Sequence, residues 1–254
     1  MIERIHRFFR YAEEGVCDEV AKTAHGTALV TPTLPLVWQV NAIRAEDRDA
    51  TAKQLAAEAD EVQAAFGHRK CIVHDEKLGA RLAPGFEKLG WNVFRVLIML
   101  RRREPDRPAQ PPPGGPVSRA VGAAALAAFR REQPFGWQEQ AVRQLAEMDA
   151  RYDRVLAARD FASPPDDPGC ACRLYMHDGL GQVDEVGTLM SRRRRGHARA
   201  AVAAAADAAT ADGCTDVLIV TDASDWPQEL YRSLGFDEIG ATYEFLKLPI
   251  TSRP

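Results

Sequence analysis

A proline- and glycine-rich segment, REPDRPAQPPPGGPVS, runs from Arg103 to Ser118 and divides the chain into two parts. It is polar and has neither a helical nor a strand period, which is typical of a linker. Each remaining part has the ordinary length of a domain. We therefore predict a domain over residues 1–103, a linker over 104–118 and a second domain over 119–254.

The composition is that of an ordinary globular chain. With 254 residues and a formal net charge of -3, the chain lacks the basic excess of proteins that coat nucleic acid. No segment approaches the roughly 20 apolar residues of a membrane span, and the N-terminus lacks the apolar core of a secretory signal. We expect a cytoplasmic protein with neither a nucleic-acid nor a membrane partner.

The five cysteines are odd in number and include no C-x-x-C pair, and no clustered histidines accompany them. This pattern argues against both a disulfide framework and a zinc site. We expect free thiols and no metal.

The C-terminal part alternates between helical and strand patterns. Asp178-Gly179 has the chemistry of a hairpin turn, and the alanine-rich run after Gly196 is a helix by propensity. Asp225 is expected to cap the last helix, with Pro227 in its first turn and Gln228 completing a capping box. The predicted helices are 119–132, 137–155, 198–212 and the segment up to Gly235; the predicted strands are 155–162, 170–177, 182–190, 215–220 and 237–248.

The loop SRRRRGHA joins the strand at 182–190 to the alanine-rich helix. A strand, a loop with a glycine and a helix bring backbone N–H groups and the helix dipole together on an anion. Gly196 lets a phosphate approach where a Cβ would obstruct it, Ala198 keeps the first turn small, and the arginines add bidentate donors. The loop predicts a pyrophosphate site.

This segment resembles the GNAT acetyltransferase superfamily, whose pyrophosphate loop reads Arg or Gln, x, x, Gly, x, then Gly or Ala. Arg193, Gly196 and Ala198 match that pattern. The strand before the loop and the following TDVLIVTDASDWPQELYRSLGF resemble the same superfamily. The resemblance covers about Val121 to Pro249.

The resemblance implies an α/β (α+β) fold: a mixed sheet, flanked by helices, that splays open between the strand at 182–190 and the strand VLIV. It implies acetyl-CoA as cofactor and acetyl transfer to a primary amine of a small molecule or peptide. The implied cofactor contacts are Val186, Gly187, Thr188, Arg193, Arg194, Arg195, Gly196, His197, Ala198 and Arg199.

Two catalytic candidates follow from the resemblance. Tyr231 matches the family's tyrosine and is the candidate general acid; the alternative is a core aromatic. Glu185 is the candidate base, and a solvated carboxylate is the alternative, because the family's strand glutamate falls on Gln182. Asp184 and Glu185 point to opposite faces of a regular strand, and a bulge would reverse the choice. The family's asparagine before the last helix has no match near Ser224, which puts that cofactor contact in doubt.

FEKLGW at 86–91 and YRSLGF at 231–236 both have an aromatic residue, Leu-Gly and a second aromatic residue at the same spacing. Each segment of this Leu-Gly echo follows a predicted strand and helix and precedes a predicted strand. In view of the resemblance, the echo predicts a smaller, degenerate GNAT-like N-terminal domain, as in tandem proteins of the family. No glycine loop leads from a strand into a helix between Val40 and Cys71, so we expect no cofactor site there. Its apolar strand at 91–100 is expected to join a shared or adjacent sheet and to wall the acceptor pocket. The alternative is an unrelated helical cap.

Two other classes of function remain open at this stage. The arginines could form a nucleic-acid patch, but acidic residues flank them and no aromatic residues are interleaved. A non-catalytic acyl-CoA-binding module is the other alternative. The sequence identifies neither the acceptor amine nor the oligomeric state.

Overall fold

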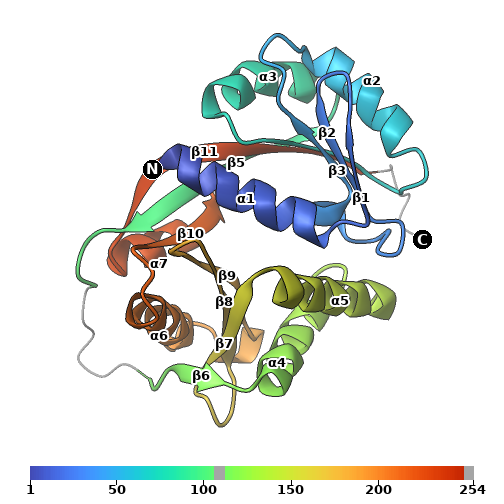
Figure 1. The fold of residues 1–254 in the computed structure, drawn as a ribbon. Helices are drawn as coiled ribbons and strands as arrows, with labels where there is room; N and C mark the ends of the chain where they lie inside the picture. Colours follow the sequence, from blue (N-terminus) through green and yellow to red (C-terminus); the bar gives the residue numbers. More distant parts are fainter. Residues whose placement is uncertain (106–111, 249–254) are drawn as a thin grey trace. The chain divides into compact units, whose positions relative to one another are not determined.

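The computed structural model describes residues 1–105 and 112–248. The strands of these residues form one eleven-stranded sheet in the order β1-β2-β3-β4-β11-β5-β10-β9-β8-β7-β6 (Figure 1). β3 pairs with β4 and β9 with β10 in parallel, whereas the hairpins β1–β2 and β8–β9 are antiparallel. The prediction of a mixed sheet flanked by helices is confirmed.

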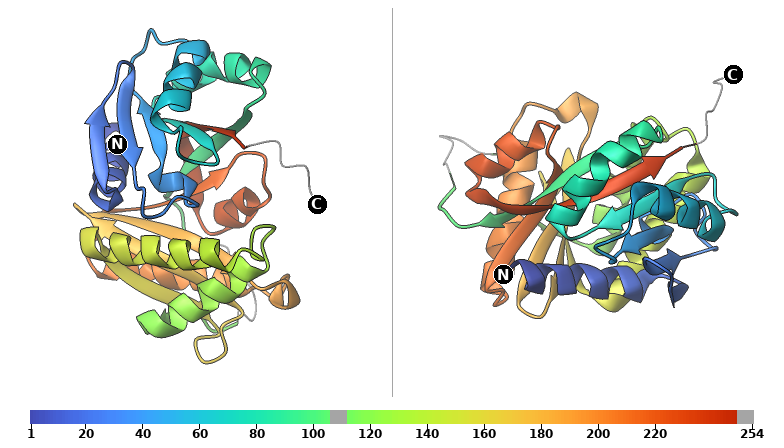
Figure 2. Two further views of the ribbon diagram at one scale, coloured as in Figure 1. Left: turned by 90° about the vertical axis from the view of Figure 1, so that its right-hand side faces the viewer. Right: turned by 90° about the horizontal axis from the view of Figure 1, so that it is seen from above.

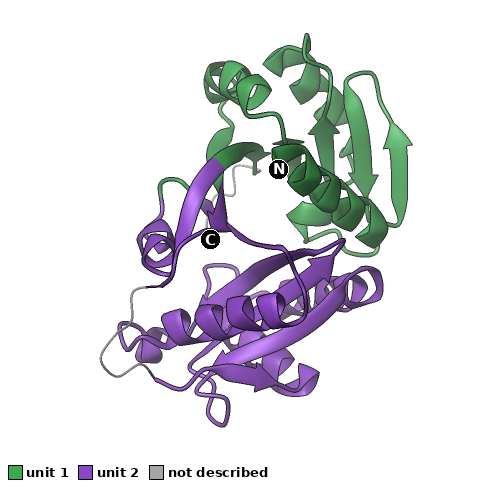
Figure 3. Cartoon of the chain, turned by 60° about the vertical axis from the view of Figure 1, so that its left-hand side comes forward, with its two compact units in different colours: residues 1–97, 222–224, 240–254 green, residues 98–221, 225–239 purple. Residues whose placement is uncertain are grey.

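Two compact units divide the chain (Figure 3). Unit 1 comprises residues 1–97, 222–224 and 240–254, and unit 2 comprises 98–221 and 225–239. β5 and β11 each contribute residues to both units. The domain boundaries expected from the sequence stay a prediction, since the units describe packing and not the origin of each half.

In unit 2, helices α4 and α5 lie on one face of strands β7, β8 and β9, and α6 lies on the other face (Figures 1 and 2). The alanine-rich helix forms as predicted and buries its alanines against β7, β8 and β9. The elements are β6 (Gly115–Val117), α4 (Arg119–Arg131), α5 (Glu139–Val155), β7 (Ala157–Ser163), β8 (Cys170–His177), β9 (Leu180–Thr188), α6 (His197–Ala211), β10 (Asp216–Asp222), α7 (Pro227–Ser233) and β11 (Phe236–Lys247).

Unit 1 has the same kind of layering. Ile43 of β3 packs in the apolar core with α2 and α3, whereas its neighbour Arg44 points to the opposite face and contacts α1. The alternation of a strand thus separates the helices onto two faces. The elements are α1 (Ile2–Val16), β1 (Glu19–Lys22), β2 (Gly26–Val30), β3 (Ala42–Ala45), α2 (Ala52–Val62), β4 (Arg69–Val73), α3 (Glu76–Lys88) and β5 (Asn92–Arg101).

The two halves of the chain repeat one order of elements. Apart from the short 3-10 helices, the first half runs α1-β1-β2-β3-α2-β4-α3-β5, and the second runs α5-β7-β8-β9-α6-β10-α7-β11 after two elements, β6 and α4, that have no counterpart in the first. The two halves also exchange their last strands: β11 pairs with β4, and β5 lies beside β10. The expectation that the strand at 91–100 joins a shared sheet is therefore confirmed.

The two Leu-Gly echoes end equivalent helices. Gly90 follows α3 with a φ of 74°, and Gly235 follows α7 with a φ of 86°. A left-handed residue after a helix is a position that glycine adopts without a steric penalty. Phe86 and Tyr231, at corresponding positions of the echoes, are both buried.

The predicted cap of the last helix is wrong. α7 begins at Pro227 after Trp226, and no side chain caps it. The Asp225 carboxylate accepts a hydrogen bond from the Trp226 N–H at 2.8 Å, one residue outside the helix. The Asp225 carboxylate thus binds within the turn that precedes α7 and not in the first turn of the helix.

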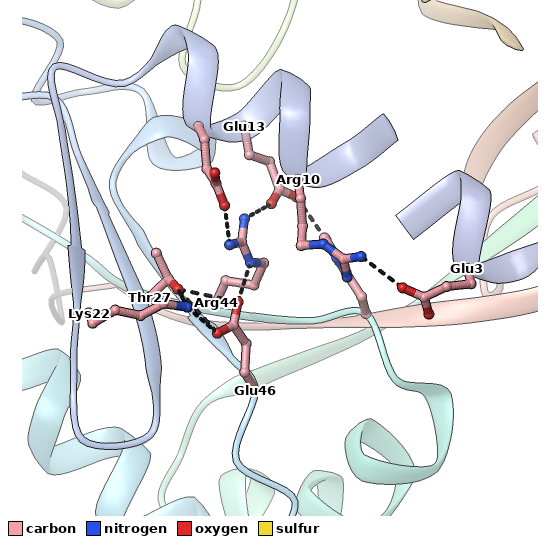
Figure 4. A network of polar contacts seen from close by, with 9 residues as sticks. Glu3, Arg10, Glu13, Lys22, Thr27, Arg44 and Glu46 are labelled. Atoms are coloured by element: carbon pink, nitrogen blue, oxygen red, sulfur yellow. Dashed lines mark hydrogen bonds and ion pairs between the residues drawn. The ribbon is translucent and has the colours of Figure 1, made fainter. Parts of the chain in front are cut away.

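An ion network around the buried Arg44 fixes α1 to β3 in unit 1 (Figure 4). The Arg44 guanidinium donates to Glu13 at 3.0 Å, to Glu46 at 3.0 Å and to Glu14. His74 forms a further 2.8 Å contact with Glu13. Burial alone would raise the pKa of Glu13, but His74 and Arg44 outweigh it and hold that pKa below its usual value.

Replacing Arg44 by methionine is expected to lower the free energy of unfolding by about 3 kcal/mol, because Glu13 would lose a charged partner in a buried site. Urea unfolding at neutral pH measures the loss. Arg48→Met is the matched control, since its side chain is 83% exposed. Equal stability of the two variants would contradict the structural role of the network.

Candidate functional site

Strands β9 and β10 separate partway along their length. Their parallel pairing runs from Leu180 with Asp216 to Val183 with Ile219 and goes no further. A cavity of about 230 Å³ opens beyond that point. It is lined by Phe129 of α4, Val183, Asp184, Glu185 and Val186 of β9, Ile219 and Val220 of β10, and Tyr231 of α7. The sheet therefore splays at the position expected from the sequence.

A β-bulge in β9 faces this cavity. Asp184 pairs with Arg173 of β8, but the next pair is Gly187 with Ala171, so β9 has one extra residue there. Glu185 adopts a left-handed φ of 53° within the bulge. In a regular strand adjacent side chains point to opposite faces, whereas here Asp184 and Glu185 both line the cavity.

Asp184 is held by two hydrogen bonds. Its carboxylate accepts the Gln182 amide at 2.9 Å and the Glu185 N–H at 2.8 Å. Burial, and then the neighbouring negative charge of Glu185, raise the pKa of Asp184 to about 7. A carboxylate with this pKa accepts and releases protons near neutral pH.

Glu185 differs from Asp184 because it has a cationic partner. Its carboxylate accepts a hydrogen bond from the Arg130 guanidinium at 2.7 Å. Arg130 also binds Asp149 through both terminal nitrogens, at 2.8 and 2.9 Å. The structure thus places Glu185 in the cavity, as the sequence prediction requires of a base, but within an ion pair.

Tyr231 reaches the cavity from α7. Its side chain is buried, and its ring packs edge-on against Phe236 at a centroid distance of 6.5 Å. Burial, followed by the charge of Asp184, raises the pKa of Tyr231. The hydroxyl therefore keeps its proton over the whole physiological range.

The arginine loop leads from β9 directly into α6. Gly196 is the N-cap of α6, with a φ of 82°, and no side chain caps this helix. Arg193, Arg194 and Arg195 are exposed around it, whereas Arg192 forms an ion pair with Asp167 at 2.5 Å. An uncapped helix start beside three exposed guanidiniums is suited to a phosphate group.

Other predicted cofactor residues have roles within the protein. The His197 ring lies 3.1 Å from the Ser163 hydroxyl, and Arg199 donates to the Ser233 hydroxyl at 2.6 Å. Gly187 leaves room for Phe129, because a Cβ there would lie 2.4 Å from the phenyl ring. Ala198 is half-buried in the first turn of α6, and Val186 and Thr188 are half-buried on β9.

The corresponding helix of unit 1 begins differently. Thr51 caps α2, and the Gln54 side chain completes a capping box, so the helix start is satisfied by its own side chains. The preceding segment, residues 46–51, contains acids and no glycine. An anion has no comparable site there.

The part of the chain that the structure describes contains no group of three or more His, Cys, Asp or Glu side chains placed to hold a metal ion. Within residues 1–105 and 112–248, no helix combines the length and apolar character needed to cross a bilayer.

Comparison of the chain with known protein families and solved structures agrees with this geometry. Residues 124–236 match the model described as the acetyltransferase (GNAT) family, a span of less than half of the chain. Among curated proteins, none is significantly similar to this chain.

Two similar solved structures share the fold over nearly the whole chain, and a third shares it over part of the chain. A GCN5-related N-acetyltransferase from Kribbella flavida is 20% identical, with a TM-score of 0.62 over 96% of this chain and 95% of its own. A functionally unknown conserved protein from Staphylococcus epidermidis ATCC 12228 is 15% identical, with a TM-score of 0.68 over 92% and 95%. A tandem GNAT protein from the clavulanic acid biosynthesis pathway is 12% identical, with a TM-score of 0.50 over 79% and 70%. The chain has the GNAT acetyltransferase fold.

Sequence reasoning missed part of the site. Strand alternation separates Asp184 from Glu185 unless a bulge intervenes, and the sequence gives no signal for Arg130 or Phe129 of α4. Asp160 of β7 does not line the cavity and contacts Arg173 at 3.2 Å. A bulge has no single-residue signature in this sequence, so the placement of both acids in one cavity is visible only in the structure.

Proposed function

We propose that the protein is an acetyl-CoA-dependent N-acetyltransferase that acts on a primary amine of a small molecule or peptide. One observation carries this proposal: a cavity with a carboxylate of raised pKa and a protonated tyrosine lies at the splay of β9 and β10, where β9 leads into an uncapped, arginine-rich helix start. Glu185, the base expected from the sequence, lines the same cavity.

The residues of the loop fit acetyl-CoA. Arg193, Arg194, Arg195 and the start of α6 would hold the pyrophosphate, and the β9 edge at Val186 to Thr188 would hold the pantetheine arm. Bound acetyl-CoA supplies an activated acetyl group as a thioester. The fit rests on the glycine at the helix start and on guanidiniums that remain exposed.

Asp184 and Tyr231 supply the proton transfers. Asp184 accepts a proton from the acceptor amine, so that nitrogen gains a free electron pair for attack on the acetyl carbon. A C–N bond forms and the C–S bond breaks, and the departing thiolate takes the Tyr231 proton. The nitrogen loses its second proton to solvent as the amide forms. Asp184 then releases the first proton and the Tyr231 oxygen regains one from solvent, so both groups are restored and one proton is released for each acetyl group transferred.

The N-terminal half is proposed to be a degenerate copy of the same domain. The repeated order of elements and the parallel pair β3–β4, which corresponds to β9–β10, support this origin. The capped start of α2 supports a structural role without a second cofactor site.

The test is an amine screen with acetyl-CoA. We expect release of free thiol that depends on the amine, together with an N-acetylated product detected by mass spectrometry. Binding of acetyl-CoA without any amine-dependent thiol release would favour a non-catalytic acyl-CoA-binding protein. Absence of binding would contradict the loop assignment as well.

Tyr231→Phe is expected to lower kcat about thirtyfold with little change in acetyl-CoA affinity, because a proton donor acts in the transition state while the ring packing is retained. Steady-state kinetics and calorimetry measure the two quantities. Tyr11→Phe, on an exposed tyrosine of α1, is the control. Equal losses of turnover and affinity, or no loss, would remove Tyr231 from the mechanism.

A further inference from the structure

We propose that Arg130 is a positioning residue, which holds the Glu185 carboxylate in an ion pair and so leaves Asp184 as the base of the site. The roles of the two acids rest on the proposed function. The electrostatic role of Arg130 concerns the protein without substrate and can be measured independently.

The geometry around Arg130 joins three elements. Arg130 lies on α4, Asp149 on α5 and Glu185 in the bulge of β9. Arg130 and Asp149 are 3% and 1% exposed, and Arg130 donates to both acids at 2.7 to 2.9 Å. A bidentate pair of this kind fixes the guanidinium plane, and the third hydrogen bond fixes the Glu185 side chain.

The charges support this arrangement. Burial alone would lower the pKa of Arg130, but the carboxylates of Glu185 and Asp149 raise it, so Arg130 remains a cation. The Arg130 cation is thus shared by the buried Asp149 and the half-buried Glu185, with Arg119 a further 4.0 Å neighbour of Asp149. The free energy of keeping the two carboxylates ionised depends on Arg130.

Several groups besides these act on Asp184. Glu185 and Asp149 raise its pKa by their negative charge, and Arg173 of β8 lowers it. Tyr231 of α7, Tyr175 of β8 and Cys172 of β8 also interact electrostatically with Asp184, and burial keeps these three neutral near pH 7. The charged groups that shift the pKa of Asp184 are therefore Glu185, Asp149 and Arg173, and we infer that Arg130 acts through its ion pairs with the first two.

Removal of the Arg130 charge is expected to act on Asp184 in a defined direction. Glu185 would then lose its cationic partner, and Asp149 would retain only Arg119, at 4.0 Å. Both anions would act more strongly on Asp184, which would disfavour its ionised form. A purely structural effect has the opposite sign, because loosening of the bulge would admit water and relieve the burial that raises this pKa.

The experiment follows the titration of the Asp184 side chain by carbon-13 NMR, with the resonance assigned from Asp184→Asn. In Arg130→Gln we expect the titration midpoint of Asp184 to rise by about one pH unit above that of the native protein. Arg130→Lys should restore part of the difference. Arg131→Gln is the matched control, since Arg131 is the next residue, is exposed and pairs with Glu139, and it should leave the midpoint unchanged.

A second variant keeps the proposal testable if Arg130→Gln does not fold. Asp149→Asn removes an anion and leaves Arg130 paired with Glu185, so the Asp184 midpoint should fall. An unchanged or lowered midpoint in folded Arg130→Gln, or an unchanged or raised midpoint in Asp149→Asn, overturns the proposal. If the native protein transfers no acetyl group to any amine, the proposed function fails, while these titrations still decide the role of Arg130.

Discussion

Asp184→Asn is expected to lower kcat for acetyl transfer about a thousandfold, because an amide cannot accept the amine proton and general bases contribute about a hundred- to ten-thousandfold. The affinity for acetyl-CoA should change little, since the groups proposed to hold its pyrophosphate and pantetheine arm are unchanged. Asparagine retains the shape of the side chain and the acceptor for the Glu185 N–H. Steady-state kinetics with the acceptor amine, together with calorimetry of acetyl-CoA binding, measure the two effects.

The role of Asp184 as base also predicts how kcat/KM changes with pH. The base must be ionised, and the pKa of Asp184 is raised to about 7, so kcat/KM of the native protein should fall as pH decreases below about 7. In Asp184→Asn this acidic limb should disappear. Asp49→Asn, in an exposed turn of unit 1, serves as the control. A larger loss in Glu185→Gln than in Asp184→Asn would instead support the base expected from the sequence.

Gly196→Glu should weaken acetyl-CoA binding about a thousandfold. The new carboxylate would lie at the helix start where the pyrophosphate is proposed to bind, and a juxtaposition of like charges costs several kcal/mol. Glycine is also required there by its φ of 82°. Gly196→Ala separates the two effects, because it introduces the backbone strain without the charge, and it should lose much less affinity.

Calorimetry measures the affinities, and circular dichroism checks that each variant is folded. Gly67→Glu is a control for the substitution itself, since a Cβ at Gly67 has open space around it. An unchanged affinity in folded Gly196→Glu would show that the cofactor binds somewhere else.

The elements nearest the loop could be predicted from sequence because their signals are local. The alanine run, the Gly196 start and the apolar strand before the last helix each occupy a few consecutive residues, and the structure forms all three. The splay of β9 and β10 came from the family resemblance, and the parallel pairing ends at Val183 as that resemblance implies.

The identity of the base depended on contacts between distant residues. A bulge in β9 brings Asp184 and Glu185 to the same cavity, and its extra residue is visible only against the register of β8. The partner of Glu185 is Arg130, which lies 55 residues earlier in the chain. No local pattern in the sequence encodes either relation.

The sequence also does not predict that the two halves exchange their last strands, β5 and β11. The apolar run at 91–100 predicts a buried strand, but apolar character does not choose a neighbour, and the structure orders β5 between β11 and β10. The prediction that Asp225 caps the last helix is wrong for a related reason. A short acidic side chain can accept a hydrogen bond in a turn as well as at a helix start, and here Asp225 accepts from the Trp226 N–H outside α7.

A crystal structure of the protein with acetyl-CoA tests the central claim most directly. We predict one cofactor per chain in unit 2, with its pyrophosphate on residues 193–199 and its acetyl group in the cavity formed by Asp184, Glu185 and Tyr231. A cofactor bound in unit 1, or a pyrophosphate away from the start of α6, would contradict the account.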